Sequence, residues 1–125
     1  MNRVTRIVSV LVLALAAGAA WAVPSNKWRL EFSGAAESDG EIVFTVIPIG
    51  GPPEDVTVII GRADGENQIA DKATEAFTIA VGQDYHVERD DGEDVLVKRR
   101  DGAPLFDVRM VHNTVQGVRV KFDAE

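Results

Sequence analysis

The chain has 125 residues, no cysteine, and 13 Lys and Arg against 20 Asp and Glu, which gives a formal charge of −7. Its length predicts a single domain, and the lack of cysteine excludes disulfides, thiol catalysis and zinc–thiolate centres. The acidic balance disfavours binding to nucleic acid or to anionic membrane surfaces, because both partners would carry the same sign of charge.

The first 22 residues have the pattern of an export signal. Arg3 and Arg6 make a positive segment, an apolar run follows, and Ala-Trp-Ala ending at Ala22 offers the small–x–small motif of a cleavage site. The run is shorter than the roughly 20 residues that span a bilayer. We therefore expect cleavage after Ala22 and a location in the periplasm or outside the cell, with an uncleaved membrane anchor as the alternative. Residues 23–125 then carry eleven Lys and Arg against 20 acids, a charge of −9.

Three strands are expected before the only helix signal, at residues 27–32, 41–49 and 56–60. In the first, Trp28, Leu30 and Phe32 alternate with charged residues, which is typical of a half-buried strand. The second is apolar on both faces, which suits a central strand, and it should end near Pro48 because proline cannot donate a ladder hydrogen bond. A Gly-Gly-Pro-Pro loop at residues 50–53 separates the second strand from the third.

One amphipathic helix is expected at residues 65–81. Its apolar positions follow the 3.6-residue period on one stripe: Ile69, Ala73, Ala76, Phe77 and Ala80. Asp64 is the expected N-cap, Glu66 suits the positive end of the helix dipole, and Gly82 is the expected stop.

The second half of the chain predicts short strands joined by tight turns. Alternating apolar residues mark four of them, near residues 85–87, 95–97, 106–110 and 118–122. Asp91-Gly92 between two alternating runs is a strong hairpin signal, and residues 101–104 form a second turn. We therefore expect a meander of antiparallel strands. The fold class predicted for residues 23–125 is a single α+β domain, a mostly antiparallel sheet of about six or seven short strands with the helix packed on one face.

Four acids surround the turn at Gly92, namely Asp90, Asp91, Glu93 and Asp94. They do not have the spacing of an EF-hand, which requires a glutamate where this chain has Lys98. A weak calcium site shared with Asp101 or Asp107 is one interpretation. The interpretation that we favour is a solvated hairpin turn flanked by surface charges.

The two histidines, His86 and His112, lack the spacings of zinc sites and are expected on the surface. No serine lies in a nucleophile motif, and no phosphate-binding loop is present in the sequence. The sequence therefore predicts no catalytic, cofactor-binding or metal-binding residue.

From Val56 onward the chain resembles a module inserted in flagellar cap proteins, flagellins and phage tail proteins. The resemblance is carried by VTVII, Asp64, Ile69-Ala70, and the later segments VLVKRR, LFDVRMV and GVRVKF. The chain departs from those proteins because it lacks the coiled-coil terminal regions through which their subunits assemble. The resemblance implies a β-rich interaction module without catalytic residues.

These observations favour an exported, non-enzymatic binding domain for a protein or polymer partner. The loop at residues 50–55, the turn around Asp91 and the sheet edges are the expected contact surfaces. Two alternatives remain, a metal-dependent or acid–base hydrolase that uses scattered carboxylates with His86, and an inhibitor of a secreted hydrolase.

Overall fold

The computed structural model describes residues 24–125, so the predicted signal segment and its cleavage site after Ala22 lie outside the described residues. The described part contains seven strands and one helix, which confirms the expected α+β class. In chain order they are β1 (Lys27–Ser33), β2 (Gly40–Pro48), β3 (Glu54–Ile60), α2 (Glu66–Val81), β4 (Tyr85–Asp90), β5 (Asp94–Arg99), β6 (Phe106–Asn113) and β7 (Arg119–Ala124).

The seven strands divide into two sheets that face each other. One sheet has the order β4-β5-β1-β7 and the other β3-β2-β6, and all neighbouring strands are antiparallel. The expected meander is therefore wrong beyond its first hairpin. Of the four strands that follow the helix, only β4 and β5 pair with each other. The turn at residues 101–104 carries the chain to the other sheet, where β6 pairs with β2, and β7 then returns to pair with β1.

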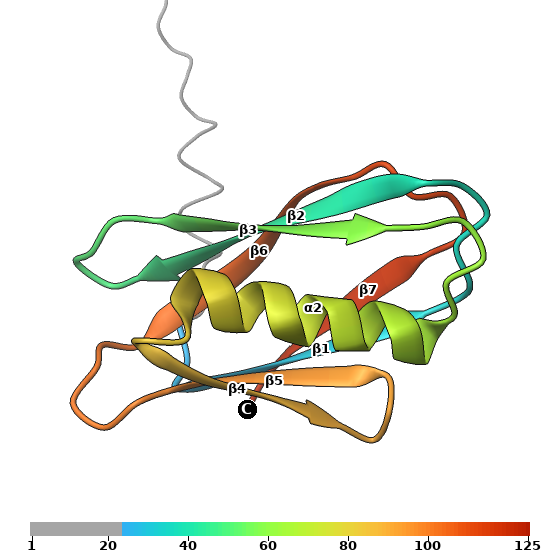
Figure 1. Cartoon of the computed structure of the whole chain (residues 1–125). Helices are drawn as coiled ribbons and strands as arrows, with labels where there is room; N and C mark the ends of the chain where they lie inside the picture. The colour runs from blue at the N-terminus through green and yellow to red at the C-terminus, as the bar shows by residue number, and fades with distance from the viewer. Residues whose placement is uncertain (1–23) are drawn as a thin grey trace, which may run out of the picture.

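Helix α2 lies across the open side between the two sheets, from β3 on one sheet to β4 on the other (Figure 1). Its inward face buries Ile69, Ala70, Ala73, Phe77 and Val81. The predicted apolar stripe is thus confirmed, and its remaining members, Ala76 and Ala80, are partly buried against the same core. The sheets and the helix together enclose one interior.

The helix begins at Glu66, one residue later than predicted. Gly65 occupies the N-cap position, and its amide donates to Oε1 of Gln68 at 2.7 Å. The prediction of Asp64 as N-cap is wrong, because the Asp64 carboxylate accepts from the Gly61 amide at 2.9 Å and from the Lys72 ammonium instead. The bond from Lys72, and to a smaller extent the bond from Gly61, holds the pKa of Asp64 below its usual value. Gly82 ends the helix as expected, donating its amide to the Thr78 carbonyl.

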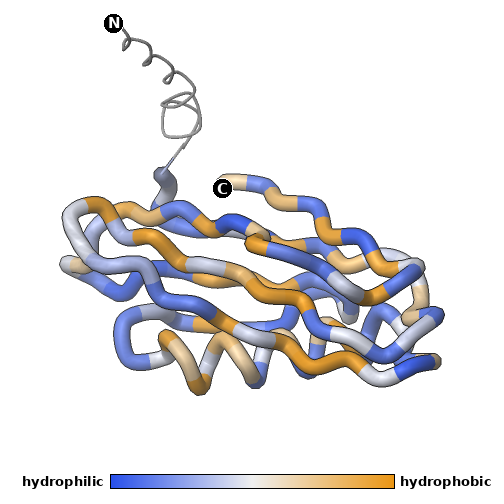
Figure 2. Tube along the Cα trace, turned by 90° about the horizontal axis from the view of Figure 1, so that it is seen from above, coloured by the Kyte–Doolittle hydropathy of each residue, from blue (hydrophilic) through white to orange (hydrophobic). Residues whose placement is uncertain are grey.

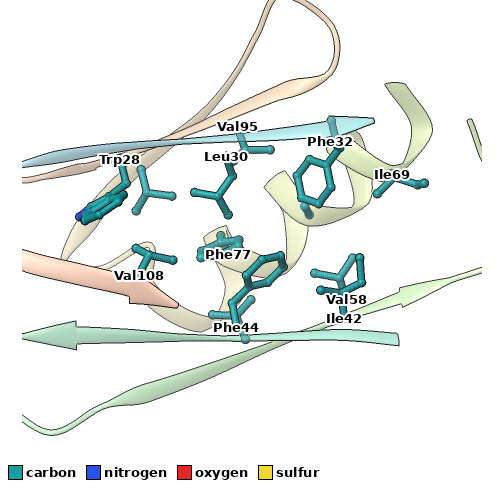
Figure 3. Packing of buried hydrophobic residues seen from close by; sticks show 14 of the residues in the cluster. Trp28, Leu30, Phe32, Ile42, Phe44, Val58, Ile69, Phe77, Val95 and Val108 are labelled. Carbon is teal, nitrogen blue, oxygen red and sulfur yellow. The ribbon is translucent and has the colours of Figure 1, made fainter. Parts of the chain in front are cut away.

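Aromatic side chains of the two sheets and of helix α2 pack against one another in the core (Figure 3). The Phe44 ring of β2 lies 5.3 Å from Phe77 of the helix, 6.2 Å from Phe32 of β1 and 6.0 Å from Phe122 of β7, centroid to centroid. Figure 2 shows apolar residues interspersed with polar ones along the chain. Along β1 and β3 every second residue is buried in the core, whereas β2 buries consecutive apolar residues and is apolar on both faces.

Replacing Phe44 with alanine should therefore remove contacts to both sheets and the helix at once. We expect Phe44→Ala to lower the free energy of unfolding by about 3–5 kcal/mol, since the cavity cannot close without moving all three parts. Val111→Ala, at an exposed apolar position of β6, should change it by less than about 0.5 kcal/mol. Urea unfolding measures both values, and equal effects of the two substitutions would contradict this description of the core.

Candidate functional site

The structure places the two histidines on different sheets. Nε2 of His86, on β4, lies 2.9 Å from Oε1 of Glu88 on the same strand. Nε2 of His112, on β6, lies 2.9 Å from Oε2 of Glu41 on β2. Both side chains are exposed as expected, and within residues 24–125 the ring Nε2 of each histidine lies within hydrogen-bond distance of a single carboxylate. The arrangement does not bring His86 and His112 into one site.

The acidic stretch forms the predicted hairpin turn between β4 and β5. Asp91 and Gly92 both have positive φ angles, 51° and 77°, as a tight hairpin requires. The expectation that all four acids are solvated is wrong for Asp94, which is only 6% exposed. The reason is Arg29 on β1, whose Nη1 donates to Oδ2 of Asp94 at 2.7 Å and to Oδ2 of Asp90 at 3.0 Å.

Arg29 is the centre of a charge network on the outer face of its sheet. Its Nε also donates to Oε2 of Glu125 at 2.6 Å, and Lys27 forms an ion pair with the same carboxylate. The bonds to Glu125, Asp94 and Asp90 raise the pKa of Arg29, and the Arg29 bond holds the pKa of Glu125 below its usual value. One guanidinium thus ties β1 to the β4–β5 turn and to residue 125.

A concave surface lies at the end of β5 that is far from the β4–β5 turn. The β2–β3 loop, the end of α2 and the β5–β6 turn meet there. This cleft has a volume of about 700 Å³. Ile49 and Ile79 lie on its wall and are 55% and 79% exposed, while Tyr85 is almost fully buried there. Burial raises the pKa of Tyr85, and the neighbouring charge of Asp84 adds to the effect.

The cleft continues into a shallower groove of about 410 Å³ between β3 and α2. Both surfaces share Ile79 and Ala80 of the helix. On the strand side the groove is lined by β3 residues 57–59, among them Ile59, which is 66% exposed. Since β3 is the edge strand of its sheet, the groove runs beside backbone groups that have no neighbouring strand. We refer to the cleft and this groove together as the β3 groove.

The sequence located part of this surface and missed the rest. The loop at residues 50–55, an expected contact surface, contributes Gly50, Gly51, Pro52 and Glu54 to the cleft. The turn around Asp91 lies at the opposite end of β5. Ile79 was missed, although an apolar residue that falls off the buried stripe of an amphipathic helix is a signal for an exposed contact.

The chain matches no family model, no curated protein and no solved structure in the comparisons made with known proteins. The resemblance to the flagellar and phage tail modules stays a prediction. In the part of the chain that is described, α2 is too short and too polar to cross a bilayer.

The Arg29 network predicts how stability depends on pH. Because the folded-state pKa of Glu125 is lowered, its contribution to stability is complete above the unfolded value of about 4.3 and is lost as the pH falls through the folded-state pKa. At pH 7 we expect Arg29→Gln to lower the free energy of unfolding by about 1.5–3 kcal/mol, since it also leaves Asp94 without its cation. The difference from the parent protein should shrink as the pH falls below about 4.3 and Glu125 becomes protonated.

Urea unfolding at a series of pH values tests this dependence. Arg119→Gln is the matched control, because Arg119 is exposed on β7 and forms no ion pair within residues 24–125. An Arg29 effect that stays constant with pH, or that Arg119→Gln reproduces, would contradict the assignment.

Proposed function

We propose that this chain is an exported, non-enzymatic binding domain that holds an extended segment of a partner polypeptide in the β3 groove. The proposed location, in the periplasm or outside the cell, rests on the signal-like pattern of residues 1–22. The observation that carries the proposed activity is the continuity of an exposed apolar surface with an unpaired strand edge.

The apolar contacts come from three isoleucines that line the β3 groove. Ile49, Ile59 and Ile79 are each more than half exposed. Burying an aliphatic side chain of this size contributes about 1.5–3 kcal/mol. Three such residues on one continuous surface support contact with apolar side chains of a partner.

The edge of β3 supports a partner in extended conformation. β3 has seven residues and pairs with β2 along one side only. Alternate N–H and C=O groups therefore point away from β2, and a partner strand can bond to them in the mode known as strand addition. The side chains of such a strand alternate, so that every second one faces the protein.

Charge supports a basic partner. Glu54 and Asp84 line the cleft, and Glu75 lines the groove. None of these three carboxylates forms an ion pair among residues 24–125, whereas Lys72, the one cation lining these surfaces, is engaged by Asp64. A segment that alternates apolar with Lys or Arg side chains complements this surface.

Binding of short peptides tests the proposal. We expect a seven-residue peptide of alternating valine and lysine to bind, and the alternating valine–glutamate peptide to bind at least tenfold more weakly. Chemical shifts of ¹⁵N-labelled protein should change along β3, at the end of α2 and at residues 50–54. Failure of the lysine peptide to bind, or shift changes confined to other surfaces, would overturn the proposal.

A pair of matched substitutions tests the apolar part of the surface. Ile79→Gln should weaken binding of the lysine peptide about tenfold, because one tenfold step corresponds to about 1.4 kcal/mol of lost apolar contact. Val111→Gln replaces another exposed apolar side chain, on β6 and outside the β3 groove, and should leave the affinity unchanged. Fluorescence anisotropy with labelled peptide measures both, and equal loss in the two variants would contradict the assigned surface.

A further inference from the structure

Three carboxylates come together at the start of β5, away from the β3 groove. Oxygen atoms of Glu31, Glu93 and Asp94 lie within 4.8 Å of one another. Glu31 is the cross-strand partner of Asp94 in the β1–β5 pairing. The turn is fixed against β1 by a hydrogen bond from the Phe32 amide to the Glu93 carbonyl, 3.1 Å long. Glu31 and Asp94 are thus held in place by strand pairing, and the backbone of Glu93 by its bond to β1.

One oxygen of Asp94 has no partner. The residue is 94% buried, and its Oδ2 accepts from Arg29. Its Oδ1 is buried and, among residues 24–125, has no hydrogen-bond donor within reach. A buried carboxylate oxygen without a donor or a cation carries a large desolvation cost. This atom therefore points to a ligand that the carboxylate cluster would hold.

The cationic side chains near the cluster do not pair with Oδ1 of Asp94. Arg29 is shared among Asp90, Oδ2 of Asp94 and Glu125. Lys121 is the cross-strand neighbour of Glu31 on β7, but its side chain is exposed and forms no ion pair within the described residues. The three acids thus retain a surplus of negative charge.

We propose that Glu31, Glu93 and Asp94 bind one divalent cation of the size of Ca²⁺. Such an ion takes six to eight oxygens at about 2.3–2.6 Å, so oxygens on opposite sides of it are about 5 Å apart. One ion can therefore reach all three carboxylates, with water completing its shell. The cluster offers oxygen atoms alone, which suits a hard cation, whereas zinc favours nitrogen and sulfur ligands.

The ligand set differs from the four acids that surround Gly92 in the sequence. Asp90 is engaged by Arg29, and Asp91 occupies the exposed tip of the turn. Glu31 comes from β1, 62 positions before Glu93 in the chain. A bound cation would fasten the β4–β5 turn to β1, and its proposed role is structural. This inference does not rest on peptide binding in the β3 groove.

Thermal melting with calcium tests the site. Protein first treated with a chelator should melt roughly 5 °C higher in about 10 mM CaCl₂ than in NaCl of equal ionic strength, because extracellular calcium sites have dissociation constants of about 0.1–1 mM and a native-state ligand stabilises the fold. Glu31→Gln and Glu93→Gln should each abolish most of this shift, each variant being compared with its own calcium-free melt. Calorimetric titration with CaCl₂ should show one ion per chain.

Asp91→Asn is the matched control, since it removes a charge from the same turn and asparagine accepts the positive φ at that position. It should keep the calcium shift. The proposal is overturned if calcium raises the melting temperature no more than NaCl does, or if Asp91→Asn loses as much of the shift as Glu93→Gln. Loss of the shift in Glu93→Gln alone, with Glu31→Gln unchanged, would also overturn the three-residue site.

Discussion

The contact between Phe77 of α2 and Phe44 of β2 is the interaction on which the arrangement of the molecule depends. Two sheets of three and four strands leave an apolar interior that is open between β3 and β4, and α2 closes that side. Without the helix, the inward faces of both edge strands would be in contact with water, at a cost of about 25 cal/mol for each Å² of apolar surface. The position of the helix also creates the β3 groove, because the groove is the line along which α2 meets the edge of β3.

A second constraint is electrostatic and acts on the outer face of the other sheet. Arg29 holds Asp90, Asp94 and Glu125 around one guanidinium, which allows an almost buried carboxylate at the start of β5. The other carboxylate oxygen of Asp94, Oδ1, has no partner among the described residues and would bind the proposed cation. β5 has the acidic cluster at one end, whereas at its other end the guanidinium of Arg99 bonds to the carbonyl of Ala103 in the cleft wall. The two proposed sites therefore lie at opposite ends of one strand and can be tested separately.

The sequence predicted the features that depend on local patterns. The period-two alternation at Trp28, Leu30 and Phe32, the helical stripe through Ile69 and Phe77, and the turn at Asp91-Gly92 are all present in the structure. Each of them depends on residues that are close in the chain. The division into two sheets could not be predicted, because the pairing of β6 with β2 and of β7 with β1 joins segments far apart in sequence. The residues of the charged sites could not be predicted for the same reason. Arg29 beside Asp94, and Glu31 beside Glu93, become neighbours only when β1 pairs with β5.

Native-state hydrogen exchange tests most directly whether α2 unfolds together with the core or separately from it. If Phe77 and Phe44 hold helix and sheets in one cooperative unit, the slowest amides of α2, near Ala73 and Phe77, should exchange with the same free energy as those of β2 and β5, and with the same dependence on denaturant. Exchange of the helix amides through an opening at least about 2 kcal/mol easier than global unfolding, with the sheets still protected, would contradict this account.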